Sequence, residues 1–214
     1  MNNLFIDEID FLWDSFRNGD DKSFSIIYQC HINKLLSYGL KISSDREIVY
    51  DCIQDVFVDL FLKRHKFNVD IKDLKAYLFS ALRNSILKRL SKNRRLELFE
   101  SKEKQEELVF NVEYSFQEHI INQEISTEIN EKLKRAITSL PSRQKEIIYL
   151  KFEEGMSYEE IASILKITIE SARKLIYRAL ISLREKIDNK LFQVLFFICF
   201  QEKLHSYSVS ECLH

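Results

Sequence analysis

The sequence has very few residues that break helices or form tight turns. Its 214 residues include one proline, Pro141, and three glycines. A β-sheet protein of this length needs many turns built with glycine or proline, so their scarcity predicts a chain that is nearly all helix. With 45% hydrophobic and 30% charged residues, the chain can still bury a core, and its composition is not that of a disordered protein.

Cysteine pairs and long apolar runs are also missing. The four cysteines form no CxxC pair and no zinc-type spacing, so we predict reduced thiols, no metal site and a cytoplasmic location. The first residues are acidic and lack the basic-then-apolar pattern of a signal peptide. The longest apolar run, Leu191 to Phe200, has ten residues and includes Gln193. A membrane helix needs about 20 residues, so we expect no membrane insertion.

The net charge of −1 hides a segregation of charge along the chain. Residues 83–95 contain six basic residues and no acid, and residues 96–131 contain ten acids and two lysines. Residues 166–190 contain seven basic residues and three acids. These blocks predict two basic surfaces separated by an acidic connector, so the low net charge does not exclude a protein that binds nucleic acid.

Two helices of the first half are predicted from turn signals and periodicity. One covers residues 24–40 and ends near Gly39. Ser44 and Glu47 fit a capping box that starts the next helix, which runs to Arg64. The apolar residues of this second helix follow the spacing of one buried stripe. They are Val49, Cys52, Ile53, Val56, Phe57 and Leu60.

The segment SYEEIASILKITIESARKLIYRAL, from Ser157 to Leu180, contains two short apolar rhythms joined by a turn. Ser157 and Glu160 fit a capping box, and a second helix begins near Thr168. Two helices joined in this way describe a helix-turn-helix, whose second helix fits a DNA major groove about 12 Å wide. The second helix leaves these residues outward: Glu170, Ser171, Arg173, Lys174, Tyr177 and Arg178.

The charge pattern alone fits an antiparallel helix pair with a solvated face equally well. The turn also departs from the usual pattern, because Lys166 lies where helix-turn-helix sequences often have glycine. A left-handed backbone at a residue other than glycine costs about 1 kcal/mol.

The segment from Leu140 to Ile187 resembles region 4 of the sigma-70 family of RNA polymerase sigma factors, in the extracytoplasmic-function group. Asp51 to Phe61 (DCIQDVFVDLF) is similar to region 2.2 of the family. Leu74 to Arg95 is similar to regions 2.3 and 2.4, with Tyr77 where the family usually has tryptophan. The region 4 resemblance rests on Leu140-Pro141, Arg143-Gln144, Gly155, Ser157 to Ala162, Arg178-Ala179 and Leu183-Arg184.

The resemblance implies an all-α fold with two helical domains, a region 2 bundle and a region 4 helix-turn-helix, joined by an acidic linker. We assign residues 5–95 to region 2, 96–126 to the linker, 127–188 to region 4 and 189–214 to an apolar tail. The implied function is to bind core RNA polymerase, direct it to promoter DNA and help open that DNA. The family also implies an anti-sigma factor as a common partner, and no catalytic residue, metal or cofactor.

In this family, region 2.2 contacts the clamp helices of the largest polymerase subunit. The implied contacts are Asp51, Gln54, Asp55, Phe57, Val58 and Phe61. Independently of the family, an acidic and apolar strip suits a basic partner helix. Phe57 can equally be a core residue.

Regions 2.3 and 2.4 would open and read the minus-ten promoter element, with a base pocket at residues 65–73. The implied contacts are Tyr77, Arg83, Asn84, Lys88, Arg89, Lys92, Arg94 and Arg95. As alternatives, Tyr77 is a core aromatic and the lysines only aid solubility.

Region 4 would read the minus-thirty-five element with Thr168, Glu170, Ser171, Arg173, Lys174, Tyr177 and Arg178. Among these, Glu170 either caps its helix or accepts a hydrogen bond from cytosine.

The sequence speaks against two other classes of protein. An enzyme is disfavoured because the five histidines are scattered and the sequence has no HExxH, no glycine-rich phosphate loop and no GxSxG. A dimeric helix-turn-helix regulator that does not bind core polymerase is the alternative, but it leaves the segment from Asp51 to Arg95 unexplained.

Overall fold

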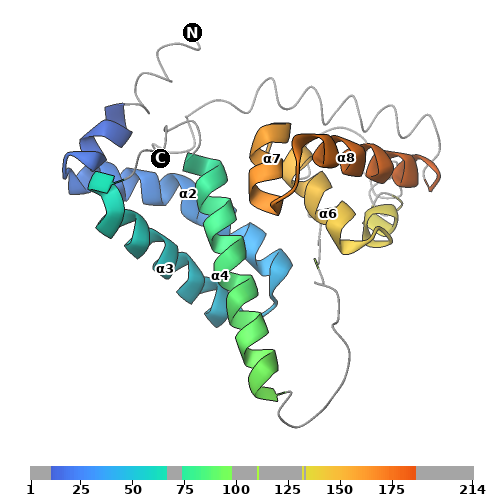
Figure 1. Ribbon diagram of the computed structural model, residues 1–214, viewed down its shortest axis with the longest axis horizontal. Coiled ribbons are helices and arrows are strands. Elements are labelled where there is room, and N and C mark those ends of the chain that lie inside the picture. The colour runs from blue at the N-terminus through green and yellow to red at the C-terminus, as the bar shows by residue number, and fades with distance from the viewer. Residues whose placement is uncertain (1–10, 67–73, 98–109, 111–131, 133, 187–214) are drawn as a thin grey trace, which may run out of the picture. The chain divides into compact units, whose positions relative to one another are not determined.

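The computed structural model describes residues 11–66, 74–97, 110, 132 and 134–186, without the side chains of residues 93–97. Within those ranges the chain forms helices and no strand, which confirms the predicted all-α class. The chain divides into two compact units (Figure 1). Of the described residues, those up to 97 form unit 1, and Phe110 with the residues from 132 to 186 forms unit 2. The domain boundaries given above remain predictions.

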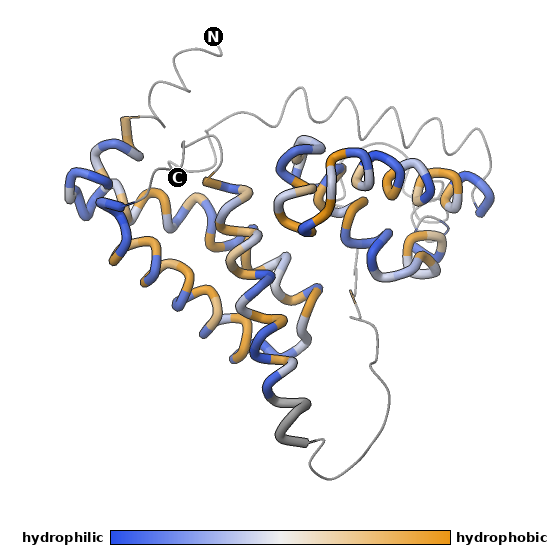
Figure 2. The backbone as a smooth tube through the Cα atoms, in the orientation of Figure 1, coloured by the Kyte–Doolittle hydropathy of each residue, from blue (hydrophilic) through white to orange (hydrophobic). Residues whose placement is uncertain are grey.

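Unit 1 is built from three helices that contact one another in pairs: α2 (Asp21–Ile42), α3 (Arg46–Lys63) and α4 (Leu74–Glu97). A 3-10 turn, η1 (Arg64–Lys66), follows α3, and a short helix at 11–17 precedes α2. Hydrophobic and hydrophilic residues alternate along each of these helices (Figure 2), because one face of each turns towards the shared core.

The predicted apolar stripe of α3 is confirmed, since all six of its residues are buried. The predicted helix start is wrong by one residue. Asp45, not Ser44, is the N-cap, and its carboxylate accepts hydrogen bonds from the backbone N–H groups of Glu47 and Ile48. Asp45 therefore satisfies two of the N–H groups that have no partner inside the helix.

Helix α2 also continues past the predicted end, to Ile42, so Gly39 lies inside it. A Cβ atom at Gly39 would lie 2.6 Å from Val49 Cγ1 of α3 and 3.3 Å from Ile86 Cδ1 of α4. Glycine is needed there for the close approach of three helices, not to end one.

Unit 2 contains α6 (Ser142–Ile148), a π-helical turn η3 (Tyr149–Glu153), α7 (Tyr158–Leu165) and α8 (Ile169–Arg184). Gly155 has φ 71°, as expected of the residue that ends a helix. The apolar centre of unit 2 is formed by side chains from every one of these elements, including Ile147, Leu150, Ile161 and Ile176.

One residue of the predicted acidic linker belongs to this centre. Phe110 is 1% exposed, and its ring centroid lies 6.1 Å from that of Tyr149 in the π-helical turn. The linker therefore contributes an apolar anchor to unit 2, which the acidic composition of the segment does not reveal.

Candidate nucleic-acid and protein interfaces

Helices α7 and α8 form the predicted helix-turn-helix. The Ser157 hydroxyl accepts from the Glu160 N–H, and the Glu160 carboxylate accepts from the Ser157 N–H, so the predicted capping box is confirmed. Thr168 caps α8 by accepting from the Ser171 N–H. Lys166 lies between the helices with φ 52° and ψ 51°, the left-handed conformation expected from its position.

The outward face of α8, together with its N-cap Thr168, carries all the residues predicted to read the minus-thirty-five element. Ala172, Ile176, Ala179 and Leu183 are buried and hold the helix against the unit. Tyr177 is 67% exposed, although large aromatic side chains are usually covered. The other predicted residues of this face are likewise exposed: Thr168, Glu170, Ser171, Arg173, Lys174 and Arg178.

Glu170 is engaged by its own helix. Its Oε1 atom lies 2.6 Å from Lys174 Nζ, one turn further along α8. Because Thr168 is the side chain that caps the helix, Glu170 acts in the first turn through its charge, which the helix dipole favours. Of the three predicted cations on this face, Lys174 is thus the one that Glu170 binds. The other two are Arg173 and Arg178.

Arg173 lies against an aromatic ring, Tyr158, that was not among the predicted site residues. Its guanidinium carbon is 5.4 Å from the ring centroid of Tyr158, at the start of α7. The Lys151 ammonium is 4.6 Å from the same centroid and donates to the Met156 carbonyl at 3.0 Å. Cation–π contacts of this kind orient the cation and limit its motion. The sequence signal that could have pointed to Tyr158 is its place as an aromatic residue directly after the N-cap Ser157.

Helix α3 presents two adjacent exposed rows in unit 1. The apolar side chains of Tyr50, Val58 and Leu62 are exposed, and Val58 is 55% exposed. They follow a four-residue spacing together with Gln54, and the acidic residues Asp51, Asp55 and Asp59 each lie one position further on. We call these seven residues the α3 strip. Tyr50 and Leu62 were not predicted, although continuing the spacing of Gln54 and Val58 would have found them.

Two predicted contacts of this region differ from the rest. Phe57 is 3% exposed, and its ring packs on Phe24 and Tyr28 of α2 at centroid distances of 6.2 and 4.7 Å. Phe57 is therefore a core residue of unit 1, and its assignment to a protein-binding surface is corrected. Phe61 is half-buried, between the Phe24 ring at 5.1 Å and the Arg64 guanidinium carbon at 4.3 Å.

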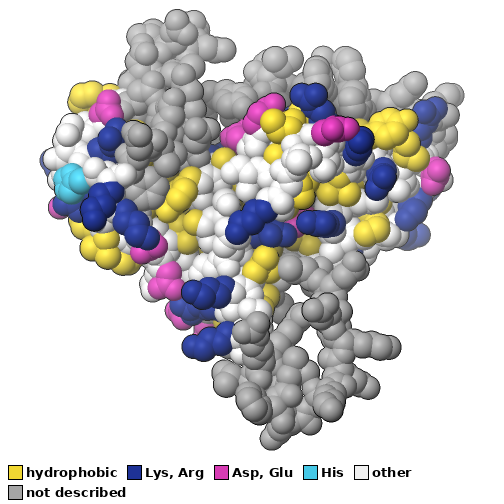
Figure 3. All heavy atoms as spheres, in the orientation of Figure 1, with side chains coloured by type: hydrophobic (Ala, Val, Ile, Leu, Met, Phe, Trp, Pro, Cys, Tyr) yellow, Lys and Arg dark blue, Asp and Glu magenta, His cyan; other side chains and the backbone are white. Residues whose placement is uncertain are grey.

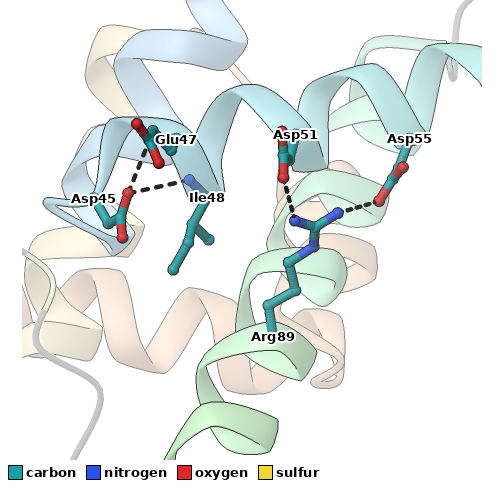
Figure 4. A network of polar contacts seen from close by, with 6 residues as sticks. All are labelled: Asp45, Glu47, Ile48, Asp51, Asp55 and Arg89. Carbon is teal, nitrogen blue, oxygen red and sulfur yellow. Dashed lines mark hydrogen bonds and ion pairs between the residues drawn. The ribbon is translucent and has the colours of Figure 1, made fainter.

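Arg89 of α4 reaches across to the acidic row of the strip (Figure 4). Its Nη1 and Nη2 atoms lie 2.8 Å from Asp51 Oδ2 and 2.7 Å from Asp55 Oδ2. The hydrogen bonds to Asp51 and then to Asp55 raise the pKa of Arg89 above its ordinary value. A residue predicted to bind phosphate thus joins two residues predicted to bind protein.

The other predicted minus-ten residues have different surroundings. Lys88 and Lys92 are exposed, and Arg83 is half-buried. Asn84 donates to Ser80 Oγ at 3.5 Å. Tyr77 is half-buried, and burial raises the pKa of its hydroxyl. The side chains of Arg94 and Arg95 and the pocket residues 67–73 lie outside the described residues.

The surface of neither unit is uniformly basic. On the face drawn in Figure 3, Lys and Arg side chains lie over both units, and Asp and Glu side chains stand close to several of them.

In the part of the chain that the structure describes, no helix is long and apolar enough to cross a membrane. The same residues hold no cluster of histidine, cysteine and acidic side chains fit for a metal ion. The apolar run 191–200 lies outside that part.

Comparisons with family models match both halves of the chain. Residues 27–96 match the model of sigma-70 region 2, and residues 130–183 match the model of sigma-70 region 4. Unit 1 thus holds the first match, and the helix-turn-helix of unit 2 falls in the second.

Curated relatives agree with these matches. The sigma factor SigM of Bacillus subtilis, described as an ECF RNA polymerase sigma factor, is 24% identical over 153 residues, which cover 72% of this chain and 88% of SigM. The ECF RNA polymerase sigma-E factor of Escherichia coli is 40% identical over 67 residues. That match spans 31% of this chain and a third, 33%, of the E. coli protein.

Two solved structures share the fold. The sigma factor RpoE of Bartonella quintana, solved with the anti-sigma factor NepR, has a TM-score of 0.56 at 24% identity, with 78% of this chain and 99% of RpoE covered. CnrH, solved with the cytosolic domain of CnrY, has a TM-score of 0.51 at 20% identity, with 82% of this chain and 94% of CnrH covered. With the region 2 and region 4 models both matched, and in that order, the chain belongs to the sigma-70 family of RNA polymerase sigma factors, in its extracytoplasmic-function group.

Proposed function

We propose that this chain binds core RNA polymerase through unit 1 and directs it to promoters that both units contact. The observation that carries this proposal is the joint presence of the α3 strip and the exposed face of α8, in the two segments that match regions 2 and 4. A dimeric regulator with one helix-turn-helix is not favoured, because it has no use for the matched region 2.

The proposed polymerase surface is the α3 strip. Its exposed apolar row can bury area against a helix, and its acidic row attracts a basic partner and sets the orientation of docking. Of the family contacts, Asp51, Gln54, Asp55 and Val58 are available on this surface, with Phe61 at its edge.

The proposed DNA surfaces lie on α8 and α4. On α8, the exposed Arg173 and Tyr177 would meet base edges in a major groove, and the exposed Arg178 would meet phosphate. On α4, Lys88 and Lys92 would hold phosphates beside the minus-ten element, and Tyr77 and Asn84 would line the pocket for an unstacked base.

Sigma factors act as regulators of transcription and not as catalysts, and we assign no reaction to this chain. We propose that it acts in the cytoplasm, where its polymerase is found. The two structural neighbours were solved with a bound partner, an anti-sigma factor for RpoE and the cytosolic domain of CnrY for CnrH. We therefore also propose that an anti-sigma factor binds this chain.

The test is reconstitution with core polymerase, read by co-purification and by transcription from a promoter library. Val58→Lys places a cation on the α3 strip and is expected to weaken core binding at least tenfold, because like charges face each other across the interface. Phe11 is 70% exposed and belongs to another helix of unit 1, so Phe11→Lys is the matched control and should bind normally. Equal binding by both variants would contradict the assignment of the strip, and a wild-type chain that does not bind core polymerase would contradict the function.

A further inference from the structure

Helix α4 supplies one cation to the acidic row of the α3 strip. The guanidinium of Arg89 places one nitrogen on Asp51, at 2.8 Å, and the other on Asp55, at 2.7 Å (Figure 4). The two aspartates are one helical turn apart, so their like charges repel when no cation lies between them. A planar guanidinium with two outer nitrogens spans both carboxylates, whereas a lysine ammonium is a single point charge.

We propose that Arg89 occupies, in the free protein, the place on Asp51 and Asp55 that an arginine of the polymerase takes on binding, and that Arg89 then moves to a promoter phosphate. This inference rests on the proposed function, in which the α3 strip faces the polymerase. Arg89 is thus an internal competitor for core binding, and it becomes a DNA ligand once core polymerase is bound.

The contact is strong enough to form and weak enough to be displaced. The side chains of Arg89, Asp51 and Asp55 are 35%, 60% and 63% exposed, so water and salt screen both ion pairs. A partner arginine that brings apolar contacts to the same strip gains more than the internal pair loses. Both arginines cannot share the site at low cost, because a second guanidinium would face the first at close range.

A destination for the released side chain lies on the same helix. Lys92 is three positions after Arg89, and residues three apart are neighbours on a helix surface. Lys92 and Lys88 are both exposed, and both belong to the set proposed to hold minus-ten phosphates. The long side chain of Arg89 can join them by changing its rotamer, with the helix backbone unchanged.

The test is the variant Arg89→Gln, measured in two binding assays. Loss of the competitor is expected to tighten binding of the free chain to core polymerase by about two- to fivefold, the scale of exposed ion pairs. Binding of the assembled holoenzyme to promoter DNA is expected to weaken by a similar factor, and its dependence on salt should fall by about one phosphate contact. Structural damage would weaken both.

Two further variants separate the competing role from the DNA role. Arg89→Lys keeps a cation for phosphate but cannot span both carboxylates, so core binding should tighten while promoter binding weakens less than in Arg89→Gln. Lys92→Gln removes a proposed phosphate contact without releasing the aspartates. Promoter binding should then weaken with no change in core affinity. Circular dichroism and thermal melting of each variant check that the helices are intact.

Weaker or unchanged core binding by Arg89→Gln would overturn the inference, because Arg89 would then brace the two carboxylates or have no role in docking. If promoter binding is unaffected, the proposed transfer to phosphate is wrong. In both cases a wild-type chain that binds core polymerase and directs transcription leaves the proposed function intact. If wild type fails to bind core polymerase, the proposed function and this inference fail together.

Discussion

Single side chains on α8 are held by neighbours before any DNA is bound. Arg173 lies against the Tyr158 ring, and Lys174 pairs with Glu170. A cation that is already oriented loses less conformational entropy when it binds a base edge. The contact with Tyr158 thus makes Tyr158 a positioning residue for Arg173, and the two side chains should affect the same step of recognition.

We predict that Arg173→Ala costs about 1–3 kcal/mol of promoter binding and relaxes the preference at one upstream base pair. Tyr158→Leu should relax the preference at the same base pair but cost less, about 0.5–1 kcal/mol, because it removes an exposed cation–π contact and keeps the arginine. Tyr158→Phe keeps the ring and serves as the control. The measurement is holoenzyme affinity for a set of single-base promoter variants. A uniform loss over all variants would show that Arg173 contacts phosphate instead.

Two residues show where sequence reasoning succeeded and failed at this scale. The periodicity of α3 placed Phe57 in the buried stripe, and the structure agrees. The family motif placed the same residue on the polymerase surface, and there the motif misled, because a motif residue can be retained for packing as well as for contact. The N-cap of α3 was predicted at Ser44 instead of Asp45, because serine and aspartate both cap helices. Only the backbone geometry decides between two such neighbours.

Packing between elements explains the shape of unit 1. Helices α2, α3 and α4 approach closely where Gly39 faces Val49 and Ile86. The sequence pattern predicts a helix end near Gly39, since glycine is common at such ends. A pattern along one helix cannot reveal that a second and a third helix touch it, so the packing role of this glycine was out of reach.

Gly39→Ala is predicted to destabilise unit 1. The new methyl group would overlap Val49 Cγ1, which costs about 1–3 kcal/mol of unfolding free energy. The higher helix propensity of alanine returns about 1 kcal/mol of this at most. Trp13 is the single tryptophan of the chain and is buried in unit 1, so its fluorescence during urea unfolding reports this unit. Ser37→Ala, at an exposed site of the same helix, is the control and should be neutral or slightly stabilising. An unchanged midpoint for Gly39→Ala would contradict the close packing.

The order of two helical units could be predicted from the sequence, because each carries its own local signals. The helix-turn-helix was recognisable from caps and apolar spacing, and Lys166, a departure from the usual glycine, takes the left-handed conformation despite its side chain. The ion pairs of Arg89 with Asp51 and Asp55 could not be predicted, since 38 and 34 residues separate the partners and no local pattern pairs them. The burial of Phe110 in the centre of unit 2 could not be predicted either, because nothing in the acidic segment around it indicates this long-range contact.

At the scale of the whole molecule, DNA binding should depend on core polymerase. The chain has a net charge of −1, and in the described part several cations are engaged by acids: Lys63 by Asp59, Arg89 by Asp51 and Asp55, and Lys174 by Glu170. These acids offset part of the basic charge and so lower the sequence-independent affinity of the free chain for phosphate. Two weak sites on one chain become a strong one only when both can engage the same duplex.

We predict that the free chain binds promoter DNA poorly at physiological salt and gains little when a duplex carries both promoter elements instead of one. Holoenzyme should bind the two-element duplex at least tenfold more tightly than either single-element duplex, because the polymerase would set the distance between the two units and release Arg89. Fluorescence anisotropy with the three duplexes, for free chain and holoenzyme at two salt concentrations, measures both ratios. A scrambled duplex of equal length gives the sequence-independent background. A free chain that already prefers the two-element duplex tenfold would mean that the polymerase is not needed to set this distance, and the coupling would then have to be sought in DNA opening alone.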